Sequence, residues 1–163
     1  MREYLFVIIV AALTTYAATP LMRTLAVRLG AYTQVRDRDV HSVPIPRLGG
    51  VAILVGFGAA ALAAARLPRL RKRFESDEIR GVLIGAAIIC LIGAIDDIRE
   101  LDWFAKLGGQ LLAAGALAFH GVQFYSLPLG GQVVLPPFIL VSLTILVVLV
   151  STNAVNFIDG LDG

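Results

Sequence analysis

The sequence predicts an all-α protein, a bundle of helices that crosses a lipid bilayer several times. Hydrophobic residues make up 58% of the chain and charged residues only 16%, and the mean hydropathy is +0.82. That composition leaves too little polar surface for a soluble domain. Apolar segments near the length of a membrane span also recur along the chain, and polar, aspartate-bearing stretches separate them in a regular order. These observations together indicate a polytopic transmembrane helix bundle.

Five apolar segments predict five spans, at residues 5–22, 48–65, 79–95, 107–124 and 138–155. The first two fit the roughly 20 residues that a bilayer requires. The last three are shorter or interrupted, so each also fits a buried or re-entrant helix, but each is bounded by charge, Gly or Pro. Between the last two, Gly130 and Gly131 lie among β-favouring residues with prolines beyond them, which predicts a short periplasmic β-hairpin.

Three polar stretches, residues 37–50, 94–110 and 153–163, are each separated from the next by two apolar segments. If each apolar segment crosses the bilayer, all three stretches return to the same membrane face. That face then carries most of the 12 carboxylates, namely Asp37, Asp39, Asp96, Asp97, Glu100, Asp102, Asp159 and Asp162. Clustered carboxylates repel one another unless a cation or a basic ligand neutralises them, so the pattern predicts a divalent metal site. Ordinary solvated loop charge is the alternative.

The basic residues indicate neither nucleic-acid binding nor a membrane orientation. The net charge is only +2, and the Lys and Arg residues are dispersed among acidic ones rather than forming a stripe. The two faces carry equal numbers of Lys and Arg, so the usual excess of positive charge on the cytoplasmic side does not distinguish them.

Asp96 and Asp97 are predicted to close an apolar helix, where they meet the negative end of the helix dipole. A magnesium ion with phosphate oxygens would offset that cost; alternatively, one aspartate is the N-cap of a helix that begins near Ile98. Asp102 and Lys106 are four residues apart, which predicts an ion pair within one helix unless Lys106 faces the site.

Asn153, Asn156, Asp159 and Asp162 recur at every third position after the last apolar segment. Amides and carboxylates placed there are costly unless they line a wet, ligand-filled cavity. A polar helix end capped by Gly160 is the alternative.

His41 and Arg47 lie near the membrane surface in a proline-stiffened approach to Gly49 and Gly50. A hydrogen-bonding and basic pair of this kind suits contact with phosphate. Either residue could equally be an ordinary loop residue.

The stretches DRDVHSVPIPRLGG from Asp37, DDIRELDWFAKLGGQ from Asp96 and NAVNFIDGLDG from Asn153 resemble motifs of one enzyme family, in order and in spacing. The family is that of the bacterial polyprenyl-phosphate N-acetylhexosamine-1-phosphate transferases, glycosyltransferase family 4. The resemblance covers nearly the whole chain. The first two stretches look more like the UDP-GlcNAc branch than the UDP-MurNAc-pentapeptide branch. Family members continue through further spans, so residues 1–163 are expected to form the N-terminal part of one membrane domain. This part is expected to be inactive on its own.

The resemblance implies a reaction on the cytoplasmic face of the bacterial inner membrane. A polyprenyl phosphate attacks a UDP-amino sugar, GlcNAc-1-phosphate is transferred, and UMP is released, with Mg²⁺ or in its place Mn²⁺ as the cofactor. A homodimer is a further partner that we would expect. By match to the motifs, the catalytic and metal-binding residues are Asp96, Asp97 and Asp159. The substrate-binding residues are His41, Arg47, Asn153, Asn156 and Asp162.

Two alternative functions stay open. One is the phosphotransferase of peptidoglycan synthesis that acts on UDP-MurNAc-pentapeptide. The other, from a different class, is a fragment of an ion-coupled membrane transporter, which predicts carboxylates near the middle of spans, whereas here they lie at segment ends.

Overall fold

The fold was analysed in a computed structural model that describes residues 1–32, 45–128 and 132–162. The described residues form a helical bundle, which confirms the predicted all-α architecture. The elements in chain order are α1 (Arg2–Leu29), α2 (Gly49–Ala65), α3 (Arg71–Phe74), α4 (Asp77–Arg99), α5 (Trp103–Phe119), β1 (Leu127–Pro128), β2 (Gln132–Val133) and α6 (Pro137–Asp162).

Three of the described helices are long and apolar enough to cross a membrane: Arg2–Leu29, Asp77–Arg99 and Pro137–Ile158. They support a polytopic membrane protein. α2 and α5 are apolar as well, but each has 17 residues. At about 1.5 Å per residue, each is about 26 Å long, slightly less than the hydrocarbon thickness of about 30 Å. The predicted second and fourth spans therefore stay predictions.

Several helices differ in extent from the apolar segments that predicted them, α1 and α5 most clearly. α1 continues past Met22 and through Pro20 to Leu29, and it ends at Gly30, whose φ of 72° places it in the left-handed region that glycine adopts readily. The apolar segment 107–124 corresponds to α5, which runs from Trp103 to Phe119. Its start is earlier because Asp102 caps it with a side-chain hydrogen bond.

β1 and β2 pair antiparallel, with Leu127 opposite Val133 and Pro128 opposite Gln132. The glycines of the predicted turn, Gly130 and Gly131, lie outside the described residues. The periplasmic hairpin consequently stays a prediction.

The end of α1 and the start of α2 are held together by a small apolar cluster. Its buried members are Ala26, Ala31 and Leu48, and Val51 and Ala94 pack against it. Ala94 lies on α4, so the cluster also brings the last turns of α4 to this point. Alanine side chains permit this close approach because they add little bulk between the backbones.

The chain that enters α2 is also fixed by its backbone. Tyr32 and Pro46 form an isolated antiparallel bridge, and the Arg47 amide donates a hydrogen bond to the Ala31 carbonyl at 2.9 Å. Arg47 and Leu48 are therefore positioned by the end of α1.

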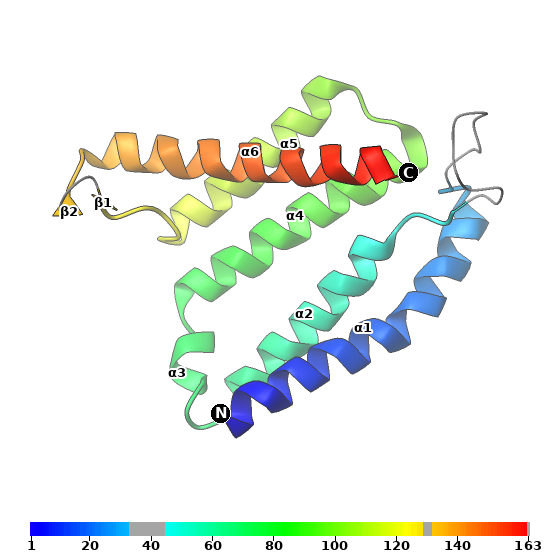
Figure 1. Ribbon diagram of the computed structural model, residues 1–163, viewed down its shortest axis with the longest axis horizontal. Coiled ribbons are helices and arrows are strands. Elements are labelled where there is room, and N and C mark those ends of the chain that lie inside the picture. The colour runs from blue at the N-terminus through cyan, green and yellow to red at the C-terminus, as the bar shows by residue number, and fades with distance from the viewer. Residues whose placement is uncertain (33–44, 129–131, 163) are drawn as a thin grey trace.

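α1 packs mainly against α2, and α5 packs against both α4 and α6. Figure 1 shows the consequence: the start of α2, the end of α4 and the C-terminal end of α6 lie toward one end of the bundle, whereas the N-terminus, α3, β1 and β2 lie toward the other. The polar stretches that the described residues include thus lie at a common end, as the sequence predicts.

Candidate functional site

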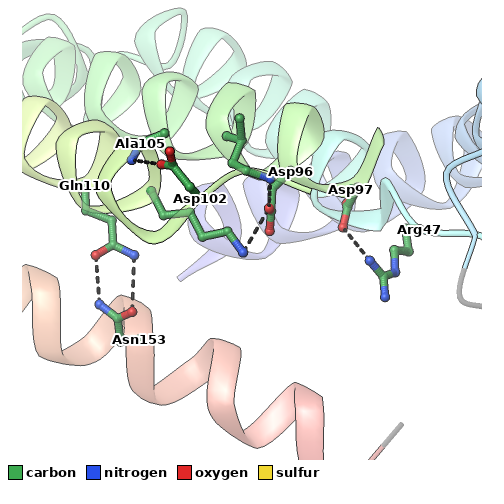
Figure 2. A network of polar contacts seen from close by, with 9 residues as sticks. Arg47, Asp96, Asp97, Asp102, Ala105, Gln110 and Asn153 are labelled. Atoms are coloured by element: carbon green, nitrogen blue, oxygen red, sulfur yellow. Dashed lines mark hydrogen bonds and ion pairs between the residues drawn. The ribbon is translucent and has the colours of Figure 1, made fainter. Parts of the chain in front are cut away.

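Asp96 is held by two short contacts at the polar end of the bundle. It lies in the last turns of α4, which end at Glu100 with a φ of 45°. The reversal of the chain after Glu100 lets the Leu101 amide donate to Asp96 Oδ1 at 2.8 Å. Lys106 Nζ approaches the same oxygen at 2.9 Å (Figure 2). One carboxylate oxygen therefore receives both a backbone and a charged donor.

Of the two predictions for Lys106, an ion pair with Asp102 or a position facing the site, the structure shows the second. Asp102 is the N-cap of α5, where its Oδ1 accepts a hydrogen bond from the Ala105 amide at 2.7 Å. That geometry satisfies one of the amides that a helix start leaves without an intrahelical partner. The Lys106 side chain reaches back to Asp96 on α4 instead, so it faces the site. The N-cap is thus Asp102, and neither Asp96 nor Asp97 serves that role.

Asp97 faces the segment that enters α2. Arg47 Nη1 lies 3.9 Å from Asp97 Oδ1, and the Leu48 amide donates to Asp97 Oδ2 at 3.4 Å. Leu48 has a φ of 73°, a left-handed backbone conformation that costs a leucine about 1–2 kcal/mol. In this conformation the Leu48 amide points at the carboxylate of Asp97, which lies on α4.

The two adjacent carboxylates are therefore neutralised by two separate cations, Lys106 for Asp96 and Arg47 for Asp97. These side chains are between 25% and 39% exposed, so solvent weakens each pair but does not abolish it. The mutual repulsion that motivated the metal prediction is offset in part by the protein itself.

A cavity of about 520 Å³ opens beside Asp97. Asp97, Thr152 and Asn156 form its polar end, and apolar residues of α2, α4 and α6 form the rest, among them Leu54, Phe57, Cys90 and Val155. Such a space can accept a charged group at the polar end and an apolar group along the wall. A second cavity, of about 670 Å³, lies along α5 from Gly108 to His120. It is lined mainly by apolar residues and none of the predicted site residues line it.

α6 contributes two amides to this end of the bundle. Asn153 forms a reciprocal pair with Gln110 of α5: its Nδ2 donates to Gln110 Oε1 at 2.8 Å, and Gln110 Nε2 donates to its Oδ1 at 3.4 Å (Figure 2). Asn156, one turn later, lines the cavity with Asp97. α6 extends through Asp159 to Asp162, but its described side chains end at Ile158.

The structure thus brings five of the predicted site residues together: Arg47, Asp96, Asp97, Asn153 and Asn156. Their assigned roles stay predictions. The Asp159 and Asp162 side chains and the whole of His41 lie outside the described part of the chain.

Sequence reasoning assigned no role to Gln110 or to the Leu48 amide. A signal for Gln110 was present, because it lies four residues after Lys106 and so shares a face of α5 with it. The Leu48 contact spans 49 residues of sequence and no local pattern marks it.

Asp97 lines the cavity and Asp96 does not, so Asp97 is the carboxylate whose position suits a magnesium ligand. Mg²⁺ is usually bound through one or two carboxylates together with substrate phosphates and water. Among the side chains that the structure describes, which exclude those of Asp159 and Asp162, no cluster of three or more His, Cys, Asp or Glu suits a metal. The donor set fits a metal that takes its remaining ligands from a substrate.

Comparison with known sequences places the chain in a family. The family model of glycosyl transferase family 4 matches residues 79–163, more than half of the 163 residues. The whole chain aligns at 41% identity with the decaprenyl-phosphate N-acetylglucosaminephosphotransferase of Mycolicibacterium smegmatis and spans 41% of that relative.

Two other relatives lie further away. A probable undecaprenyl-phosphate N-acetylglucosaminyl 1-phosphate transferase of Bacillus subtilis is 34% identical over 95% of the chain and 42% of the relative. The phospho-N-acetylmuramoyl-pentapeptide-transferase of Mycobacterium bovis is 30% identical over the whole chain and 53% of the relative. The chain thus spans about half or less of the length of these relatives. No solved structure matches it. By its family match, which includes Asp96, Asp97, Lys106, Gln110 and the last helix, the chain belongs to glycosyl transferase family 4.

Proposed function

We propose that this chain contributes to the transfer of GlcNAc-1-phosphate from UDP-GlcNAc to a polyprenyl phosphate at the cytoplasmic face of a bacterial inner membrane. An oxygen of the lipid phosphate attacks the β-phosphorus of the nucleotide sugar. The bond between that phosphorus and the oxygen bridging to the α-phosphate breaks, and UMP leaves. The names of the more similar relatives mention both N-acetylglucosamine and a polyprenyl phosphate, and these names support the substrate pair.

The observation that carries the proposal is the pair of adjacent, separately neutralised carboxylates beside a cavity with a polar end and an apolar wall. Phosphoryl transfer needs the reacting groups positioned and the oxygen charge neutralised more than it needs covalent chemistry. Arg47 and Lys106 offset the charge of the two carboxylates at this point, so a bound Mg²⁺ would be left to neutralise the phosphate oxygens. The apolar residues below Asp97 suit the chain of a lipid, and the polar end suits its phosphate.

We assign different duties to the two carboxylates. Asp96, held by Lys106 and the Leu101 amide, keeps the end of α4 in place. Asp97 faces the cavity and is the one we expect to hold magnesium or the proton of the acceptor phosphate. Mg²⁺, when bound, neutralises charge on the diphosphate. Asp159 is proposed as a further metal or catalytic carboxylate.

The remaining substrate contacts are proposed by motif. Arg47 and Asn156 lie at the polar end of the cavity or beside it, and they suit phosphate and sugar oxygens. His41 is proposed to contact phosphate and Asp162 to lie near the uridine. We also propose that all five long helices cross the bilayer, with α2 and α5 at the short end of the usual range.

The test is UMP release by the complete protein, as its gene encodes it, supplied with UDP-GlcNAc, a polyprenyl phosphate and Mg²⁺. We expect release that requires both substrates and stops when EDTA removes the metal. UDP-MurNAc-pentapeptide, offered in place of UDP-GlcNAc, is the matched donor control and should support little release. Turnover of that donor alone would reassign the substrate, and no UMP from either donor would contradict the proposal.

A further inference from the structure

We propose that Gln110 is a positioning residue of this transfer, acting through Asn153 to fix the setting of α6 beside the Asp97 cavity. The proposal rests on the function proposed above. It also offers a role for Asn153 different from the substrate contact that its motif suggests.

The first support is the geometry of the amide pair. Each side chain both donates and accepts, with distances of 2.8 and 3.4 Å, and Asn153 Nδ2 also donates to the Leu149 carbonyl one turn earlier at 2.8 Å. A reciprocal amide pair uses a donor and an acceptor of each partner. It therefore depends on the sum of the two side-chain lengths and on both side chains being amides.

The second support is the place of Gln110 on α5. Lys106 and Gln110 are four residues apart, so they lie on one face of the helix. Lys106 contacts Asp96 of α4, and Gln110 contacts Asn153 of α6 (Figure 2). This face of α5 thus links the acidic end of α4 to α6, which suits its packing against both helices.

The third support is the position of Asn156 on α6. It lies three residues after Asn153, on the same side of the helix, and lines the cavity with Asp97. If the Gln110–Asn153 pair is broken, α6 loses a restraint one turn before the residue that lines the site. A small rotation or slide of α6 would then carry Asn156 away from Asp97, and misplacement of this kind lowers the rate of a positioned reaction.

The test is an exchange of the two side-chain lengths in the complete protein. Gln110→Asn and Asn153→Gln each spoil the pair, whereas the double variant restores the summed length. We expect each single variant to lower kcat for UMP release by about 2- to 10-fold, the change that loss of one hydrogen bond gives. The double variant should recover most of the loss. Gln123→Asn, the same substitution outside the pair, is the matched control and should leave kcat unchanged.

A direct substrate contact by Asn153 makes the opposite prediction. Moving the longer side chain to position 153 would then raise the KM for UDP-GlcNAc, and Gln110→Asn would not correct it. If the fold loss of kcat in the double variant equalled the product of the two single losses, the two side chains would act independently. That result would overturn the positioning role.

Melting temperatures of the unchanged protein, the two single variants and the double variant separate this proposal from the proposed function. Suppose that the complete protein releases no UMP, but the double variant recovers the melting temperature that each single variant loses. That result would contradict the transfer but confirm the amide pair. Normal UMP release without kinetic coupling would contradict the positioning role alone.

Discussion

Replacing Gly56 by alanine tests how closely α1 and α2 approach one another. A Cβ at Gly56 would collide with Thr15 Oγ1 and lie 2.8 Å from the Ala11 carbonyl oxygen on α1, whereas a Cβ at Gly58 meets no atom within 4 Å. Both substitutions raise helix propensity by about the same amount, roughly 1 kcal/mol, so the difference between the variants isolates the contact. Because the Ala11 oxygen belongs to the backbone, α1 itself must shift.

Overpacking a close contact costs about 1–3 kcal/mol, so we expect Gly56→Ala to be less stable than Gly58→Ala by that amount. The assay is thermal unfolding of both variants of the complete protein in the same detergent, followed by circular dichroism. A difference of 1 kcal/mol shifts the melting temperature by roughly 2–4 °C in a chain of 150–250 residues, and by less in a larger one. Equal melting temperatures, or a higher one for Gly56→Ala, would refute the close approach of α1 and α2.

Three further substitutions test other parts of the account. Gly30→Ala should lower the free energy of unfolding by about 1 kcal/mol, because a φ of +72° strains any residue with a Cβ and no neighbouring atom adds to the effect. Asp102→Ala should cost about 1 kcal/mol by removing the hydrogen bond to the Ala105 amide, and Asp102→Ser should restore most of that loss. Lys106→Met should lower UMP release roughly 10-fold or more, since Asp96 loses its charged donor.

Matched controls accompany these variants. Gly115→Ala lies within α5 and meets no atom within 4 Å, so it should be at least as stable as the unchanged protein. Lys72→Met, on α3 at the opposite end of the bundle, should leave UMP release unchanged. If Gly30→Ala were as stable as Gly115→Ala, the strain at Gly30 would be refuted. If Lys72→Met lowered UMP release as much as Lys106→Met, the role of the Lys106 contact with Asp96 would be refuted.

The helical fold follows from hydropathy, because each apolar segment must bury its backbone polar groups within itself. The ends of the helices depend on local chemistry that hydropathy does not report. The apolar segment begins at Leu107, yet Asp102 caps α5 and lets Trp103 begin it. Likewise, Pro20 does not end α1; Gly30 does, through its left-handed backbone.

The candidate site was predictable as a set of residues and much less so as a set of contacts. Counting segments placed Asp96, Asp97 and Asn153 on one face, and Figure 2 shows all three in one network of polar contacts. Their partners depend on tertiary packing, since Leu48 and Asp97 are 49 positions apart and Gln110 and Asn153 are 43 apart. Local spacing suggested Asp102 for Lys106, but Asp102 caps α5 through its Oδ1 and Lys106 reaches Asp96 instead.

The central claim is that acidic side chains at the polar end of the bundle carry out the transfer, and that acidic side chains elsewhere do not. It is tested most directly by UMP release from the complete protein carrying Asp97→Asn, compared with Asp77→Asn. Asp77 lies in the first turn of α4, at the other end of the same helix, and pairs with Arg80 at 3.8 Å. We predict a loss of roughly 100-fold or more for Asp97→Asn and an unchanged rate for Asp77→Asn. Equal rates for the two variants would contradict the account.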